Sequence, residues 1–85
     1  MRYRSMKEIV FTAAAIRQWL KLPDSVRARI DDKLTAYAAG GSGDVKRLKG
    51  LAGSRLRVGD WRVIFIETNT SITVIAVGNR KDIYK

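Results

Sequence analysis

The chain has 85 residues and a formal net charge of +9, and its length supports one small domain spanning residues 1–85. It contains neither cysteine nor histidine, which excludes disulfides, a thiol nucleophile and the commonest general base and metal ligand, so neither a metal nor another cofactor is expected. The isoelectric point near 10.5 favours polyanionic partners, namely nucleic acid, a ribosome or an acidic protein segment.

The first predicted elements are a short strand and a helix. Residues Lys7–Phe11 are β-branched in their middle and predict a strand. Thr12 is a good N-cap for a helix, which the Leu22-Pro23 pair would end. The apolar residues expected to form one buried stripe on this helix are Ile16, Trp19 and Leu20.

A second, longer helix is predicted to about Ala39, with Asp24 or Ser25 as its cap. Apolar residues recur every three or four positions along it, at Val26, Ile30, Leu34 and Tyr37. The glycine-rich segment 40–43 ends the helix and is too short to separate domains.

The second half of the chain predicts three antiparallel strands. They span about Ser54–Val58, Trp61–Glu67 and Ser71–Gly78, and the loop Gly59-Asp60 is typical of a tight type II′ hairpin. The expected fold class is α+β, with an N-terminal strand, a two-helix hairpin and then an antiparallel sheet against which the helices pack.

The tight hairpin also predicts the register of its two strands. If Val58 pairs with Trp61, then Arg57 lies opposite Arg62, and Arg55 shares their face of the sheet. Like charges opposite each other destabilise a sheet, so an anion bound between these arginines would explain the arrangement. The alternative is that the arginines extend into solvent along an exposed face.

Two motifs identify a family. The strand-turn-strand RLRVGDWRVIF and the tail VGNRKDIY, together with the helical hairpin and a central LKG, resemble the RelE/ParE superfamily of type II toxin-antitoxin toxins over essentially the whole chain. The resemblance implies a RelE-like, microbial ribonuclease-type fold. RelE-like members are metal-independent mRNA endonucleases (mRNA interferases) that act in the ribosomal A site and inhibit translation, whereas ParE-like members poison DNA gyrase.

The resemblance also implies a catalytic site. Arg62, Arg80 and Tyr84 stand where the RelE-like pattern has its strand arginine, tail arginine and tail tyrosine. Arg55 and Arg57 replace two lysines, which keeps the charge but gives side chains that release a proton less easily. The five would support attack of a 2′-hydroxyl on the adjacent phosphate by neutralising charge at phosphorus.

Other roles stay open at this point. Tyr84 is either the general base or a platform that stacks on a base, and the acid that protonates the leaving oxygen is Arg80, Lys81 or water. The remaining basic residues either contact ribosomal RNA and mRNA or lie in a solvated loop; they are Lys46, Arg47, Lys49 and Lys81.

The resemblance further implies partners and two alternatives. The partners would be the ribosome, mRNA and a cognate antitoxin with an acidic or amphipathic segment, with operator DNA reached only through the antitoxin. No apolar run approaches the roughly 20 residues of a membrane span, so a cytoplasmic protein without a membrane partner is expected. The alternatives are a ParE-like gyrase inhibitor and a non-catalytic, antitoxin-paired binding module.

Overall fold

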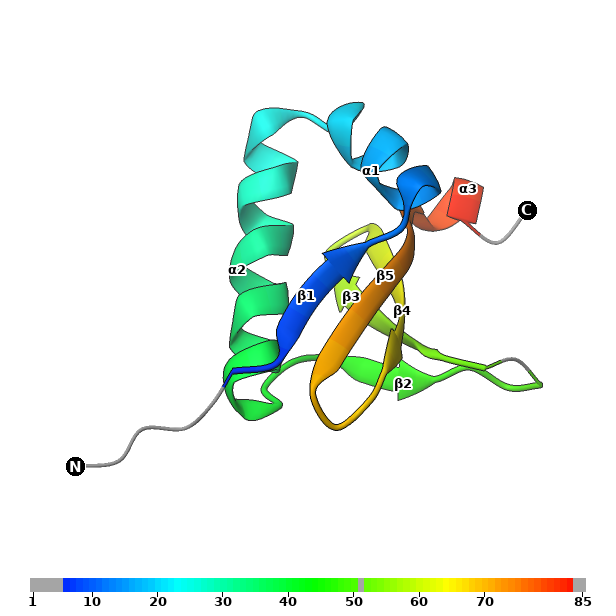
Figure 1. Cartoon of the computed structure of the whole chain (residues 1–85). Helices are drawn as coiled ribbons and strands as arrows, with labels where there is room; N and C mark the ends of the chain where they lie inside the picture. The colour runs from blue at the N-terminus through cyan, green and yellow to red at the C-terminus, as the bar shows by residue number, and fades with distance from the viewer. Residues whose placement is uncertain (1–5, 51, 84–85) are drawn as a thin grey trace.

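The computed structural model describes residues 6–50 and 52–83. Its helices are α1 (Ala13–Leu20), α2 (Asp24–Gly40) and α3 (Arg80–Ile83). Its strands are β1 (Glu8–Phe11), β2 (Val45–Arg47), β3 (Ser54–Val58), β4 (Trp61–Glu67) and β5 (Ser71–Asn79). Figure 1 shows the two longer helices packed against one sheet, which confirms the predicted α+β class.

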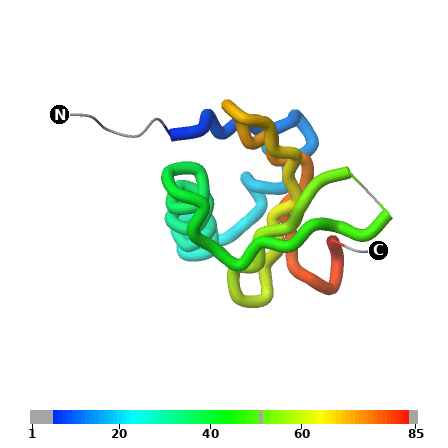
Figure 2. The backbone as a smooth tube through the Cα atoms, turned by 90° about the horizontal axis from the view of Figure 1, so that it is seen from below, coloured from blue at the N-terminus to red at the C-terminus, as the bar shows by residue number. Residues whose placement is uncertain are grey.

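The sheet has the strand order β1-β5-β4-β3-β2. Strands β2 to β5 pair with one another in antiparallel fashion, while β1 runs parallel to β5. In the view of Figure 2, α2 lies on one side, and α3 and the β2–β3 connection lie on the other. The face that receives α2 is called the inner face below, and the opposite one the outer face.

The central hairpin has the predicted register. Val58 pairs with Trp61, Arg57 with Arg62 and Arg55 with Ile64. Gly59 has a φ of 61°, and no non-glycine residue in the described part of the chain has a positive φ. A positive φ at the first central position alone is what a type II′ turn requires, so the glycine determines which residues face each other.

Two elements were missing from the prediction. β2 covers Val45–Arg47, a segment for which no strand was predicted, and α3 follows β5 directly. β2 has three residues, two of them charged, so its strand conformation depends on pairing with β3. Its existence is therefore a tertiary effect that local sequence signals do not reveal.

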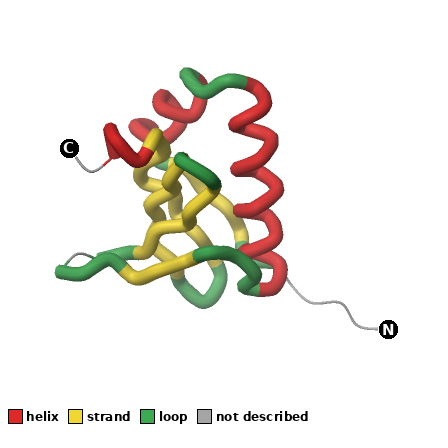
Figure 3. The backbone as a smooth tube through the Cα atoms, turned by 180° about the vertical axis from the view of Figure 1, so that it is seen from behind, coloured by secondary structure: helices red, strands yellow, loops and turns green. Residues whose placement is uncertain are grey.

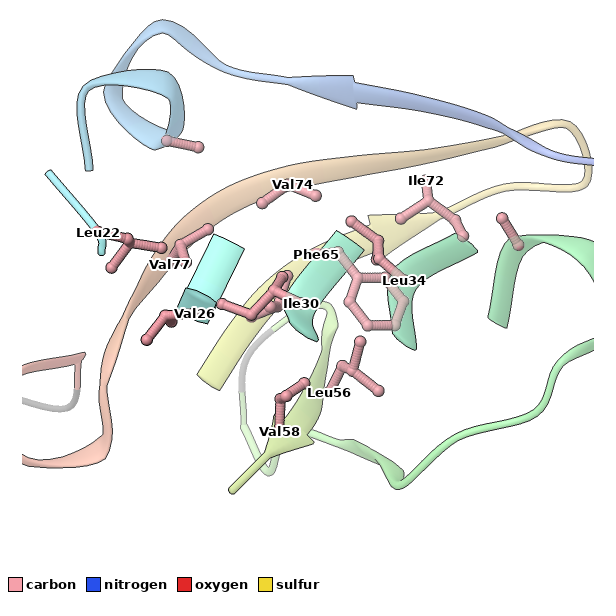
Figure 4. Packing of buried hydrophobic residues seen from close by; sticks show 13 residues of the cluster. Leu22, Val26, Ile30, Leu34, Leu56, Val58, Phe65, Ile72, Val74 and Val77 are labelled. Carbon is pink, nitrogen blue, oxygen red and sulfur yellow. The ribbon is translucent and has the colours of Figure 1, made fainter. Parts of the chain in front are cut away.

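The inner face holds the hydrophobic core. Figure 4 shows side chains of α2 directed at those of the sheet, with Ile30 and Leu34 close to Phe65. Ile30 and Phe65 are fully buried, as is Leu56 from β3. Burying a side chain of this size contributes about 1.5–3 kcal/mol, so this layer supplies most of the stability of the fold.

The predicted stripe on the first helix was partly wrong. Ile16 is 45% exposed and Leu20 is 66% exposed, whereas Ala15 is fully buried. The helix presents Ala15 and Gln18 to β5, where the Gln18 Oε1 accepts a hydrogen bond of 2.8 Å from the Val77 backbone N–H. The small alanine allows a close approach to the sheet, and the glutamine amide satisfies a backbone donor. The spacing of apolar residues predicts neither contact.

The helix caps agree with the prediction at one helix and differ at the other. Thr12 caps α1, with its Oγ1 accepting a hydrogen bond of 3.1 Å from the Ala15 N–H. For α2 the cap residue is Pro23, which makes no side-chain capping bond, so neither Asp24 nor Ser25 is the cap. Proline just before the helix restricts the chain to the entry conformation without a hydroxyl or carboxylate.

A polar cluster ties the ends of three elements together on the inner face. Glu67 accepts hydrogen bonds from the Tyr37 hydroxyl at 2.7 Å and from the Lys7 ammonium at 2.6 Å. These two bonds, Lys7 first, lower the pKa of Glu67. Burial and the bond to Glu67 raise the pKa of Tyr37 to about 12. The Glu67 cluster (Lys7, Tyr37 and Glu67) therefore joins the start of β1 to α2 and β4.

Candidate functional site

Four basic residues share the outer face of the sheet. Lys46 pairs with Arg55 across β2 and β3, and Arg57 pairs with Arg62 across β3 and β4. Paired residues project from the same side of a sheet, and alternate residues of β3 do so as well. We call this set the cationic face; it consists of Lys46, Arg55, Arg57 and Arg62.

The cationic face contains two like-charge pairs directly across from each other, which is an unfavourable arrangement for a sheet. The opposite side of the same strands instead presents core residues, such as Leu56 and Val63. The turn thus sets the register, burial of the opposite side favours the same register, and this register brings the cations together. This geometry is suited to binding an anion that bridges the strands.

Arg57 has an acidic partner that the sequence analysis missed. The Arg57 Nη2 lies 2.6 Å from the Asp44 Oδ2, with 55% and 51% of the two side chains exposed. The backbone N–H of Arg57 also donates a hydrogen bond of 2.9 Å to the Asp44 carbonyl oxygen. The only available signal was the position of Asp44, two residues before Lys46, where an extended chain places both on one side.

Arg62, in contrast, is buried and only 8% exposed. Its Nη1 donates hydrogen bonds to the carbonyl oxygens of Gly59 at 2.8 Å and Trp61 at 2.9 Å. Among the described residues, its Nε has no hydrogen-bond partner. The guanidinium therefore holds the hairpin turn and places a positive charge beneath the other members of the cationic face, with little surface of its own.

Arg80 opens α3 at the same end of the sheet. Its backbone N–H donates to the Asp60 carbonyl oxygen at 2.8 Å, and its Nε lies 3.9 Å from the Asp60 carboxylate. A Cβ on Gly78, which pairs with Arg62, would lie 3.5 Å from the Ile83 Cδ1. Since Gly78 and Arg62 share a face, α3 lies on the outer face beside the buried arginine. Figure 3 shows α3 and α2 on different sides of the molecule.

The other predicted contact residues are dispersed. Lys49 is exposed in the turn after β2, and Lys81 is exposed on α3, where its backbone N–H donates to Asn79 Oδ1 at 3.0 Å. Arg47 pairs with Ser54 on the inner side and lines an open cavity of about 640 Å³ near the Glu67 cluster. The predicted tail tyrosine, Tyr84, lies outside the described residues.

Within residues 6–50 and 52–83, no group of three or more histidine, cysteine, aspartate or glutamate side chains is positioned to hold a metal ion. No helix in these ranges is both long and apolar enough to cross a membrane.

Comparison with solved structures establishes the fold. The chain matches RelE from a RelB–RelE complex of Methanococcus jannaschii with a TM-score of 0.74 and 24% identity, covering 88% of this chain and 94% of the other. It matches isolated RelE of E. coli with a TM-score of 0.75 and 21% identity over 92% and 90%. For YoeB of Staphylococcus aureus, seen as a dimer, the values are 0.70 and 17% over 85% and 94%.

Sequence comparison gives the family. A search of curated proteins finds no match. The family described as the ParE toxin of type II toxin-antitoxin systems, parDE, matches residues 9–84, which is nearly the whole chain. The chain therefore belongs to the ParE toxin family and is a RelE/ParE superfamily toxin of a type II toxin-antitoxin system.

Proposed function

We propose that this toxin is a ribosome-dependent mRNA endonuclease that cleaves mRNA in the ribosomal A site and so inhibits translation. The observation that carries the proposal is the pairing of Arg57 with Arg62 on the outer face, with Arg55 next to them and Arg80 at the same end of the sheet. Such a set of cations matches a phosphate whose charge increases during the reaction.

The reaction is attack of a 2′-oxygen on the adjacent phosphorus, which forms one P–O bond and breaks the bond to the 5′-oxygen. The exposed guanidinium of Arg57 donates two N–H groups to the non-bridging oxygens. Arg62 stabilises the same charge from beneath, at a fixed position set by the turn carbonyls. Arg55 and Arg80 flank the phosphate.

Proton transfer falls to the tail in this proposal. Tyr84 either removes the proton of the 2′-hydroxyl or stacks on the neighbouring base. An arginine releases its proton with difficulty, so Lys81 or an ordered water is the better acid for the leaving oxygen than Arg80. The chain has no histidine that could serve as a general acid-base group, and we therefore propose that free RNA is cut slowly.

The remaining basic residues are assigned to binding. Lys46 extends the cationic face along the RNA backbone, while Arg47, Lys49 and Lys81 contact ribosomal RNA or mRNA phosphates. These contacts would orient the toxin on the ribosome, which in turn presents the mRNA. The site of action would then be the cytoplasm.

A cognate antitoxin is the second proposed partner. Relatives with this fold were solved as RelB–RelE complexes from Methanococcus jannaschii and E. coli. For this chain we propose an antitoxin with an acidic or amphipathic segment, because its net charge of +9 attracts acidic chains. Any contact with operator DNA would be made through the antitoxin.

A second candidate function is inhibition of DNA gyrase. The description of the matching family, ParE toxin, favours it. In that case the cationic face would be a protein-binding surface, and Arg80 and Tyr84 would be dispensable for toxicity.

One experiment separates the two candidates. The toxin is added to a purified translation system with a defined mRNA, cleavage is mapped by primer extension, and gyrase-mediated DNA cleavage is assayed in parallel. We expect cuts at ribosome-occupied codons with the wild type and their loss with Arg80→Ala. An intact message together with gyrase-linked DNA breaks would replace the endonuclease proposal by the gyrase one.

A further inference from the structure

Asp44 is an acidic residue placed on a surface that is otherwise basic. Its carboxylate and its carbonyl oxygen both contact Arg57, through an ion pair of 2.6 Å and a backbone hydrogen bond of 2.9 Å. It thus extends the row formed by Arg57 and Arg62 on the side away from the buried arginine. Arg62 is buried, so a ligand can reach Arg57 more easily than Arg62. The accessible arginine is therefore the one that is paired with Asp44.

Stability does not account for this ion pair. More than half of each side chain is exposed, and ion pairs of this kind contribute little to the free energy of folding because water and salt screen them. The backbone bond between the same residues would hold β2 to β3 with any side chain at position 44. The Asp44 carboxylate therefore acts mainly by occupying the Arg57 guanidinium and contributes little to the stability of the fold.

We propose that Asp44 is a positioning residue that competes with RNA phosphate for Arg57, an inference that rests on the proposed endonuclease function. A carboxylate and a phosphate use the same N–H groups of a guanidinium, and the Nη2 group is already occupied by the carboxylate. Before the exchange, Asp44 holds the guanidinium at the edge of the cationic face. A phosphate that binds Arg57 through this Nη2 group must displace the carboxylate.

This competition has a consequence for where RNA is bound. Free RNA at low concentration exchanges poorly with a carboxylate that is covalently part of the same chain, because the carboxylate has a high effective concentration. An mRNA held in the ribosome beside the toxin has a comparable effective concentration and can displace it. Asp44 thereby favours mRNA presented by the ribosome over free RNA at this site.

The inference is tested by RNA binding of the full chain, measured by fluorescence anisotropy with a short 2′-O-methyl oligouridylate, which cannot be cleaved. The test variant is Asp44→Asn, which removes the charge and keeps the shape. The control is Asp32→Asn, which changes the net charge equally on exposed α2. Asp44→Glu restores the charge, and Arg57→Ala, alone and combined with Asp44→Asn, tests whether the effect passes through Arg57.

We expect Asp44→Asn to bind about 3- to 10-fold more tightly at low salt, and to steepen the slope of log affinity against log salt by up to about 0.7, the value for one additional single-strand phosphate contact. Asp32→Asn should change affinity less than about 2-fold, since its charge is on the helix side and is screened by salt. Asp44→Glu should resemble the wild type. In the Arg57→Ala background the effect of Asp44→Asn should disappear.

Two results would overturn the inference in distinguishable ways. If Arg57→Ala weakens RNA binding but Asp44→Asn behaves like Asp32→Asn, Asp44 does not compete with phosphate, and the proposed function stands. If Asp44→Asn binds the oligonucleotide with no dependence on Arg57, the inference fails, whereas the proposed function fails separately if Arg57→Ala cleaves mRNA on the ribosome as fast as the wild type. Thermal unfolding of each variant, expected within a few degrees of the wild type, shows that the comparison is made on folded protein.

Discussion

The two faces of the sheet differ in what their residues gain from folding. On the inner face, Phe65 of β4 and Ile30 of α2 are fully buried where the helix packs against the sheet. On the outer face, Arg57 lies opposite Arg62, and its acidic partner Asp44 is half-exposed. The inner face explains why the chain folds, whereas the outer face is an arrangement that folding alone does not favour. Residues held at a cost to stability are candidates for function, and this contrast supports the cationic face as the site.

The largest effect on stability is expected from the inner face. Phe65→Ala removes a fully buried ring that lies 5.5 Å, centroid to centroid, from the ring of Tyr37. The loss of buried area and the cavity left behind should reduce the free energy of unfolding by about 3–5 kcal/mol, enough to unfold much of a small domain. Urea denaturation measures this loss in the free energy of unfolding. A loss below about 1 kcal/mol would mean that the core is elsewhere.

The turn that connects the two faces should give an intermediate effect. Gly59→Ala forces a Cβ into a φ of 61°, a strain of about 1–2 kcal/mol, and places it 2.8 Å from the Arg29 Nη2, which must move. Gly41→Ala is the matched control, because Gly41, at the end of α2, has a φ of 77° with open space around its Cβ position. Both should lose stability in urea, but only Gly59→Ala should also weaken RNA binding. If Gly59→Ala and its control bound RNA equally well, the conformation of this turn would not contribute to RNA binding.

The Glu67 cluster should give a smaller, pH-dependent effect. The pKa of Tyr37 is raised to about 12, so its contribution is complete below about pH 10, the ordinary value, and is lost as the pH rises towards 12. The pKa of Glu67 is lowered, so its contribution is lost as the pH falls below its ordinary value. In a comparison of unfolding free energies, Tyr37→Phe should lose less stability than the wild type between pH 10 and 12. Parallel curves would contradict the raised pKa of Tyr37 that burial and the bond to Glu67 produce.

Local signals were sufficient for the central hairpin. The Gly59-Asp60 loop determines the register by itself, and so Arg55, Arg57 and Arg62 were correctly expected on one face. The long helix was predicted as well, because its apolar period is regular along two or more turns. In these segments the conformation depends on neighbours in sequence, which is why a single sequence was informative.

The rest depends on contacts between distant parts of the chain. β2 forms only by pairing with β3, and that pairing brings Asp44 to Arg57 and Lys46 to Arg55. The burial of Arg62 depends on the path of the hairpin turn, whose carbonyl groups accept its hydrogen bonds. The orientation of α1 depends on a hydrogen bond that the Gln18 side chain accepts from the backbone N–H of Val77, far along the chain. The spacing of apolar residues along the chain does not predict such contacts.

The most direct test of the account is the rate of mRNA cleavage on the ribosome by Arg57→Ala, compared with Arg17→Ala, which removes the same charge from exposed α1. We expect Arg57→Ala to cleave at least about 10²-fold more slowly, as for loss of a donor to a developing oxyanion, with an unfolding free energy within about 0.5 kcal/mol of the wild type. Arg17→Ala should cleave like the wild type. Equal cleavage by both variants would contradict the claim that the cationic face is the catalytic site.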